Sequence, residues 1–226
     1  MELHTRGLVL REVTYKEADK ILTVLTEDAG KLTISAHGAR RQKSKCAALS
    51  QFLAFSELDL QERRGRWQLH EGRVITLFDG IRKDILLLAV GAYFAELLEA
   101  VSDADYADPA LLHLGITGLA ALDAGKREWP LIKAAFEFRL MCVAGYAPPL
   151  EGAQEAKAPA LQLDAGSAEA LRHIVSAPLH RVFSFTLGAK GFASLSRAAE
   201  RYVLTQLERS FRTLDFLKDL DRGNMR

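Results

Sequence analysis

The spacing of apolar residues changes at Asp79-Gly80, and this change divides the chain into two parts with different secondary structure. Before this point apolar residues alternate with polar ones, as they do in half-buried β-strands. After it they recur at intervals of three and four residues, as they do on one side of an amphipathic helix. The sequence therefore predicts an α+β fold with two domains, residues 1–79 built from strands and residues 80–226 built from helices.

Five segments of the first part have the composition and alternation of strands. They are Thr5–Tyr15, Lys20–Thr26, Lys31–His37, Phe52–Gln61 and Trp67–Phe78. Polar turns separate them, and Glu27-Asp28-Ala29-Gly30 supplies the glycine that a hairpin needs. Five short strands joined by tight turns predict a small closed barrel such as an OB-fold. An SH3-like barrel fits the same pattern nearly as well, because periodicity alone does not fix the order of the strands.

The second part reads as a series of helices. They are expected from Ile81 to Val101, from the Asp108-Pro109 start to about Gly125, from Trp129 to Gly145, from a Ser167 cap to Val175, and from about Ala189 to Arg212. The last of these places Arg197, Arg201 and Arg209 toward solvent or a partner. An irregular segment at about 147–166 is expected to hold at most a short strand, Ala160–Asp164.

The composition is that of a globular protein without a membrane span. The net charge of +1 argues against a wholly basic nucleic-acid coat, although it permits a local basic surface. The first residues lack the apolar core of a signal peptide, and the most apolar stretch carries Glu96 and Glu99. Two distant cysteines, Cys46 and Cys142, indicate reduced thiols. We expect a cytoplasmic protein.

Motifs for catalysis and for cofactors are missing from the sequence. There is no GxSxG, no Walker lysine motif and no GxGxxG, and none of the 6 histidines pairs with another at metal-binding spacing. We therefore expect no cofactor, no metal and no enzymatic activity. A hydrolase or transferase whose groups converge from distant positions stays open, but a binding module is the better class.

The strongest feature of the charge pattern is a stretch without acids between Asp28 and Glu57. It contains five cations: Lys31, Arg40, Arg41, Lys43 and Lys45. A cationic loop between strands is a plausible phosphate-contacting surface, and the alternative is a solvated loop that only maintains solubility.

A second cationic turn follows at Arg63, Arg64 and Arg66, directly before Trp67. Trp67 or Tyr15 could stack on bases, as aromatic residues do in proteins that bind single strands. The alternative for Trp67 is packing beneath the barrel.

Four segments carry a resemblance to a known family. They are EADKILTVLTEDAGKLTISAHGARRQKSK in the barrel part, and FEFRLMCVAGYAPPL, IVSAPLHRVFSF and ERSFRTLDFLKDL in the helical part. In order and spacing the chain resembles the bacterial recombination-mediator family RecO, from about Thr5 to Leu220.

The resemblance implies an N-terminal OB-fold and a C-terminal helical domain. It also implies DNA repair activity without covalent chemistry: binding of single- and double-stranded DNA, annealing of complementary strands, and partnership with RecR and single-stranded-DNA-binding protein in loading a recombinase. Many members carry a four-cysteine zinc knuckle after the GYAP motif. Here EGAQEAKAPALQLDAGSAEA contains no cysteine or histidine, so we predict no zinc.

The family's partner, single-stranded-DNA-binding protein, ends in an acidic tail with a terminal phenylalanine, which requires an apolar pocket rimmed by a cation. Lys133 and Arg139 flank Phe136 and Phe138 and supply that composition. The competing interpretation makes the two phenylalanines core residues and the cations solvated. Two other classes remain for the whole chain: an OB-fold adaptor that binds only protein, and a nuclease without recognisable motifs.

Overall fold

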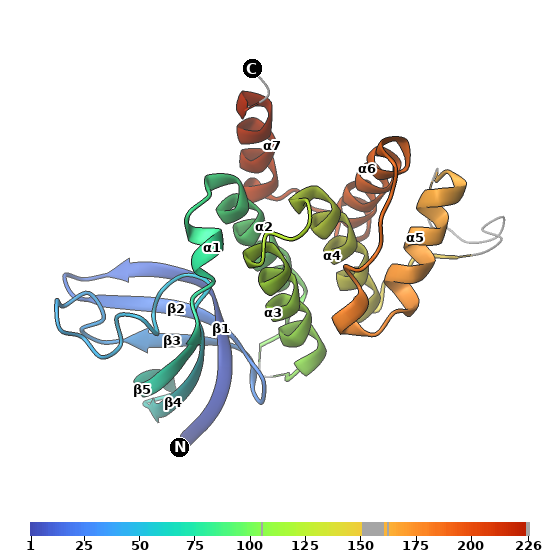
Figure 1. Ribbon diagram of the computed structural model, residues 1–226. Coiled ribbons are helices and arrows are strands. Elements are labelled where there is room, and N and C mark those ends of the chain that lie inside the picture. Colours follow the sequence, from blue (N-terminus) through green and yellow to red (C-terminus); the bar gives the residue numbers. More distant parts are fainter. Residues whose placement is uncertain (105, 151–160, 162, 225–226) are drawn as a thin grey trace.

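The computed structural model describes residues 1–104, 106–150, 161 and 163–224 (Figure 1). A β-barrel forms one side of the molecule, and helices form the other, with α1 (Asp79–Arg82), α2 (Ile85–Val101) and α3 (Pro109–Asp123) beside the barrel. Among the helices that the structure describes, none is both long and apolar enough to cross a membrane.

The five predicted strands are all present. They are β1 (Glu2–Tyr15), β2 (Asp19–Thr26), β3 (Gly30–Ala36), β4 (Phe55–Arg63) and β5 (Arg66–Thr76), and they form a closed barrel in the order β1-β2-β3-β5-β4. β1 pairs with β4 through its first half and with β2 through its second half. The parallel pairing of β3 with β5 closes the barrel at only two positions, Ile34 with Trp67 and Ser35 with Gln68. This topology confirms the predicted OB-fold class.

β1 is buried on both of its faces near its middle, because it belongs to two hydrophobic cores. Val9 packs inside the barrel with Leu22, Val24 and other barrel residues. Leu8 and Leu10, which point to the opposite face of the strand, join the core of the helical part. The run Leu8-Val9-Leu10 is therefore apolar without alternation, and the two parts of the molecule share a core across β1.

The described helical part contains α1 (Asp79–Arg82), α2, α3, α4 (Trp129–Val143), α5 (Ala165–Ser176), the 3₁₀ turn η1 (Leu179–Arg181), α6 (Ala189–Gln206) and α7 (Arg212–Asn224). Asp108 caps α3 as predicted, accepting from the backbone N–H groups of Ala110 and Leu111. The predicted cap of α5 is wrong by three residues. Asp164 caps that helix, and Ser167 donates its backbone N–H to the Asp164 carboxylate at 2.8 Å.

The prediction of one final helix from Ala189 to Arg212 is also wrong. α6 ends at Gln206, Glu208 adopts a positive φ of 49°, and α7 begins at Arg212 and packs against α2. Phe211 is buried at the start of α7 and meets Tyr93 of α2 edge to face, with ring centroids 5.9 Å apart. A straight helix could not bring Phe211, Leu214 and Leu217 onto α2.

The predicted irregular segment, 147–166, and its short strand, Ala160–Asp164, lie largely outside the described residues. Where the structure describes them, residues 147–150, Leu161, Leu163 and Asp164 form no strand, and α5 already begins at Ala165.

Candidate nucleic-acid interface

The basic loop (His37–Lys45) follows β3 and is fixed at its start to the hairpin between β1 and β2. Arg40 donates from its backbone N to the Ala18 carbonyl and from Nη1 to the Glu17 carbonyl, both at 3.0 Å. The Asp19 carboxylate accepts from the Gly38 backbone N at 2.8 Å and contacts His37 Nδ1 at 3.0 Å. These hydrogen bonds to the charged form lower the pKa of Asp19 below its ordinary value.

The four predicted phosphate contacts of this loop are all exposed: Arg40, Arg41, Lys43 and Lys45. Within the described part of the chain, none of them forms an ion pair with an acid, so their charges are uncompensated. Ala39 and Cys46, on either side of these cations, are buried in the barrel core. The loop therefore rests on the barrel by its apolar residues and presents its cations to solvent.

An exposed aromatic ring lies beside this loop. Tyr15 ends β1 with 47% of its surface exposed, and Lys16 Nζ lies 5.3 Å from the centre of its ring. Because Arg40 is bonded to Glu17 and Ala18 of the same hairpin, the end of β1 at Tyr15 and the start of the basic loop are neighbours.

The second cationic turn joins β4 to β5, and Arg63, Arg64 and Arg66 are all exposed there. Arg64 and Gly65 both have positive φ, 53° and 72°, as a tight two-residue hairpin requires. Trp67 is half-buried and packs on the barrel core, which agrees with the alternative of packing, yet it also lines a depression of about 460 Å³ with Ser35 and Arg66. The turn lies next to β3, the strand that leads into the basic loop.

Lys31 lies apart from the basic loop, although it lines the same depression as Arg66 and Trp67. Lys31 lies at the start of β3 and the basic loop follows its end, roughly 17 Å away at about 3.3 Å per residue. Its backbone N donates to the Asp103 carbonyl at 3.1 Å, and its Nζ donates to the Glu99 carbonyl, near the end of α2, at 2.7 Å. Lys31 thus joins the barrel to the helical part, and its predicted contact with DNA stays a prediction.

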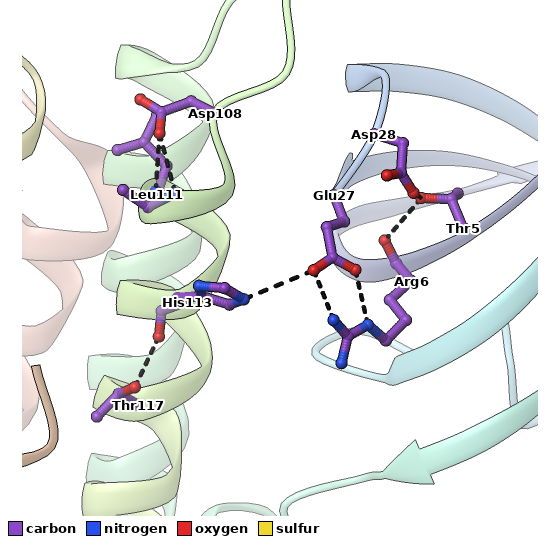
Figure 2. A network of polar contacts seen from close by, with 9 residues as sticks. Thr5, Arg6, Glu27, Asp28, Asp108, Leu111, His113 and Thr117 are labelled. Atoms are coloured by element: carbon purple, nitrogen blue, oxygen red, sulfur yellow. Dashed lines mark hydrogen bonds and ion pairs between the residues drawn. The ribbon is translucent and has the colours of Figure 1, made fainter.

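Further polar contacts fix the barrel against α3, and Figure 2 shows them as one network. Arg6 on β1 makes two hydrogen bonds to the Glu27 carboxylate, from Nε at 2.7 Å and from Nη2 at 2.5 Å. His113 on α3 reaches the same carboxylate, with Nε2 3.7 Å from Oε1. The Arg6 guanidinium holds the pKa of Glu27 below its ordinary value.

Gly30 lies at the same seam, with a φ of +66° and the Tyr106 backbone so close that a Cβ would lie 2.4 Å from its carbonyl oxygen. Only glycine fits this approach. These contacts join residues far apart in the sequence, and no local pattern predicts them.

The residues predicted to bind an acidic tail are mostly in the helical core. Phe136 is fully buried and stacks on Phe94, with ring centroids 3.8 Å apart. Lys133 is also buried, and its Nζ lies 2.7 Å from Glu137 Oε1 and 3.5 Å from Glu200 Oε2. Arg139 donates to the Ile174 carbonyl at 3.2 Å. An apolar pocket rimmed by solvent-facing cations is therefore not found at these residues, because the core uses both the rings and the lysine.

The buried lysine belongs to a polar network between helices. Tyr93 donates its hydroxyl to Glu137 Oε1 at 2.8 Å, and Lys218 of α7 pairs with Glu200 of α6. Burial raises the pKa of Glu137 and raises that of Tyr93 well above its ordinary value. The second oxygen of Glu137 has no hydrogen-bond partner among the described residues.

The prediction that zinc is absent concerns residues mostly outside the described ranges, so it continues to depend on the sequence alone. Among the residues that the structure does describe, no group of three or more histidine, cysteine or carboxylate side chains could hold a metal ion.

Comparison with known proteins identifies the family. Residues 1–78 match the family model described as Recombination protein O N terminal, and residues 82–153 match Recombination protein O C terminal. A DNA repair protein RecO from Acetivibrio thermocellus is 30% identical over 97% of this chain and 98% of its own length. Proteins of the same name from Symbiobacterium thermophilum, 26% identical over 95% of this chain and 96% of the relative, and from Exiguobacterium sibiricum, 38% identical over 65% and 58%, are also similar. The chain belongs to the RecO family of DNA repair proteins.

Proposed function

We propose that this protein is a recombination mediator that binds single- and double-stranded DNA and anneals complementary strands. In this proposal it works with RecR and with single-stranded-DNA-binding protein to load a recombinase, it acts in the cytoplasm at the nucleoid, and it catalyses no covalent step. The observation that carries the proposal is the basic loop: four exposed, uncompensated cations anchored on an OB-fold barrel in a chain of the RecO family.

The chemistry of this surface favours contact with the DNA backbone. Arginine and lysine bind phosphate oxygens without regard to base sequence, and an exposed ring such as Tyr15 can stack on any base. Arg64 and Arg66 extend the same surface along β3. A strand held by its phosphates keeps its base edges free, so a complementary strand can pair with it.

The test is the salt dependence of binding by the variant Arg40→Ala, Arg41→Ala, Lys43→Ala, Lys45→Ala. Each phosphate contact contributes about 0.7 to the slope of log affinity against log salt for a single strand. The slope of log affinity against log salt should therefore be smaller by up to about 2.8 in the variant. At low salt the variant should bind single-stranded DNA at least tenfold more weakly than wild type. Arg73→Ala is the control, because this exposed arginine of β5 forms an ion pair with Glu57 of the neighbouring strand β4.

An unchanged slope in the quadruple variant would overturn the proposed phosphate contact. The same mobility-shift measurement on the isolated wild-type chain tests the adaptor alternative, in which a partner alone binds the DNA. Incubation of end-labelled DNA with Mg²⁺ or Mn²⁺ tests for a nuclease, and we expect intact DNA.

The partner contacts need separate tests. A peptide with the sequence of the acidic tail should bind the Arg139→Ala variant as tightly as wild type, since Arg139 is occupied by the Ile174 and Val175 carbonyls. A loss of peptide affinity without a loss of stability would restore the tail site that the sequence predicts at Lys133, Phe136 and Arg139.

A further inference from the structure

A groove of about 940 Å³ separates the barrel from the α6–α7 link. Arg11, Lys31 and Phe52 line its barrel side, Glu96 and Glu99 of α2 line its floor, and Arg209 and Arg212 line its far side. No part of the function described so far uses this groove.

The carboxylates of the groove already have partners. Glu96 accepts from the Thr213 backbone N at 3.1 Å and from the Thr213 hydroxyl at 2.5 Å, so it caps α7. Glu99 pairs with Arg11 at 3.0 Å, and Glu12 pairs with Lys20. These acids therefore repel an incoming anion less than their number implies.

The two arginines of the far side are different. Arg209 and Arg212 are exposed, and in the described ranges neither forms an ion pair. The Arg209 guanidinium lies over the Phe211 ring, 5.0 Å from its centre, which restrains its position without neutralising its charge. The groove consequently has cations in excess of the acids that could neutralise them.

The groove is connected to the basic loop through β1. Leu10, Arg11 and Glu12 border the groove, and four residues further along the strand Tyr15 reaches the hairpin to which Arg40 is bonded. At about 3.3 Å per residue, Arg11 and Tyr15 are roughly 13 Å apart, a distance that a few nucleotides of single strand can span.

We propose that a DNA strand held at the basic loop continues along β1 into this groove, where Arg209 and Arg212 bind its phosphates. This inference rests on the proposed DNA binding and adds a contact from the helical part. Continuity with the basic loop and exposed Tyr15 favours a nucleic-acid strand over an acidic peptide as the occupant.

The test compares two lengths of single-stranded DNA on the variant Arg209→Ala, Arg212→Ala. An oligonucleotide of about 6 nucleotides fits on the barrel alone, whereas one of about 30 nucleotides can reach both sites. We expect the variant to bind the long oligonucleotide about tenfold more weakly than wild type, with a slope of log affinity against log salt that is smaller by about 1.4. It should bind the short oligonucleotide as wild type does.

Two controls separate this effect from a change in the fold. Arg172→Ala, Arg222→Ala removes two exposed arginines that have acidic partners within their own helices, and it should bind both lengths normally. Arg209→Lys, Arg212→Lys keeps the charges and should restore most of the affinity. Because Arg212 makes no side-chain bond among the described residues, Arg212→Ala alone should keep the melting temperature and lose part of the slope.

Equal binding of the long oligonucleotide by wild type and the double variant would overturn the inference, as would an equal loss for both lengths. Loss of acidic-peptide binding with normal DNA binding would assign the groove to a peptide instead. Each of these results leaves the basic-loop variant as an independent test, since the proposed function fails only if that variant keeps its DNA affinity.

Discussion

At the residue scale, Lys133 balances the charges of two carboxylates inside the helical core. It contacts Glu137, which is fully buried, and Glu200, which is partly exposed. Removal of one member of a buried ion pair leaves the other member without compensation, and this typically costs about 3–5 kcal/mol. We therefore expect Lys133→Met to lower the free energy of unfolding by about that amount in urea titrations.

The pH dependence of the Lys133→Met variant provides a specific signature. Burial raises the pKa of Glu137 in the folded protein above its ordinary value of 4.5. Lys133 opposes this effect, so its removal raises the folded pKa further. Well below pH 4.5 Glu137 is protonated in both states and the loss of stability is smaller; as the pH rises through 4.5 the unfolded chain releases its proton first, so stability falls. Adding Glu137→Gln should remove this pH dependence, and a loss of stability independent of pH would contradict the assignment.

At the basic loop, Asp19 gives the opposite pH dependence of stability, because folding lowers its pKa. Its pKa is lowered because it accepts the Gly38 N–H and contacts His37. The stability that this anchoring contributes is therefore present above the ordinary pKa of 3.8 and is lost as the pH falls through the lower folded pKa. In an NMR titration the midpoint of the Gly38 amide shift should therefore lie below pH 3.8. Asp19→Asn should abolish that titration, while a midpoint above 3.8 would show that the bond is not formed.

At the scale of elements, the strands were predictable because alternation is a local property, and so was the charge of the basic loop. The break between α6 and α7 was not. Leu207, Phe211 and Leu214 continue a helical spacing through the link, and the cap of α7 comes from Glu96, which is 117 residues away from Thr213. The contact of Lys31 with the helical part could not be predicted either, because its partner, the Glu99 carbonyl, lies on another element far away in the sequence.

The cap of α7 can be tested directly. Glu96→Ala removes the acceptor of two hydrogen bonds at the start of the helix and should cost about 1 kcal/mol. Amide exchange should become faster in α7 and remain unchanged in the barrel. Glu96→Gln keeps an acceptor oxygen and should lose less, and Glu208→Ala, which alters an exposed acid of the link, should have little effect on exchange.

At the scale of the whole molecule, the barrel and the helical part should unfold together. Leu8, Leu10 and Leu25 of the barrel pack in the same core as Leu98 and other helical residues, so neither part keeps its interior when the other opens. The chain has 2 tryptophans, Trp67 in the barrel and Trp129 in α4, and each reports on one part. Fluorescence of the Trp67→Phe and Trp129→Phe variants should give coincident urea transitions, and separate midpoints would show independent domains.

The burial of β1 on both faces also affects how the affinity for single-stranded DNA depends on the length of the strand. β1 packs in both cores, borders the groove at Arg11 and ends at the hairpin that holds the basic loop, so we expect the basic loop and the groove to keep a constant separation. If DNA occupies both, affinity should rise in one step at the oligonucleotide length that first bridges them, because no hinge can shorten the gap for a shorter strand. The protein would then bind single-stranded DNA tightly only when the exposed strand exceeds this minimum length.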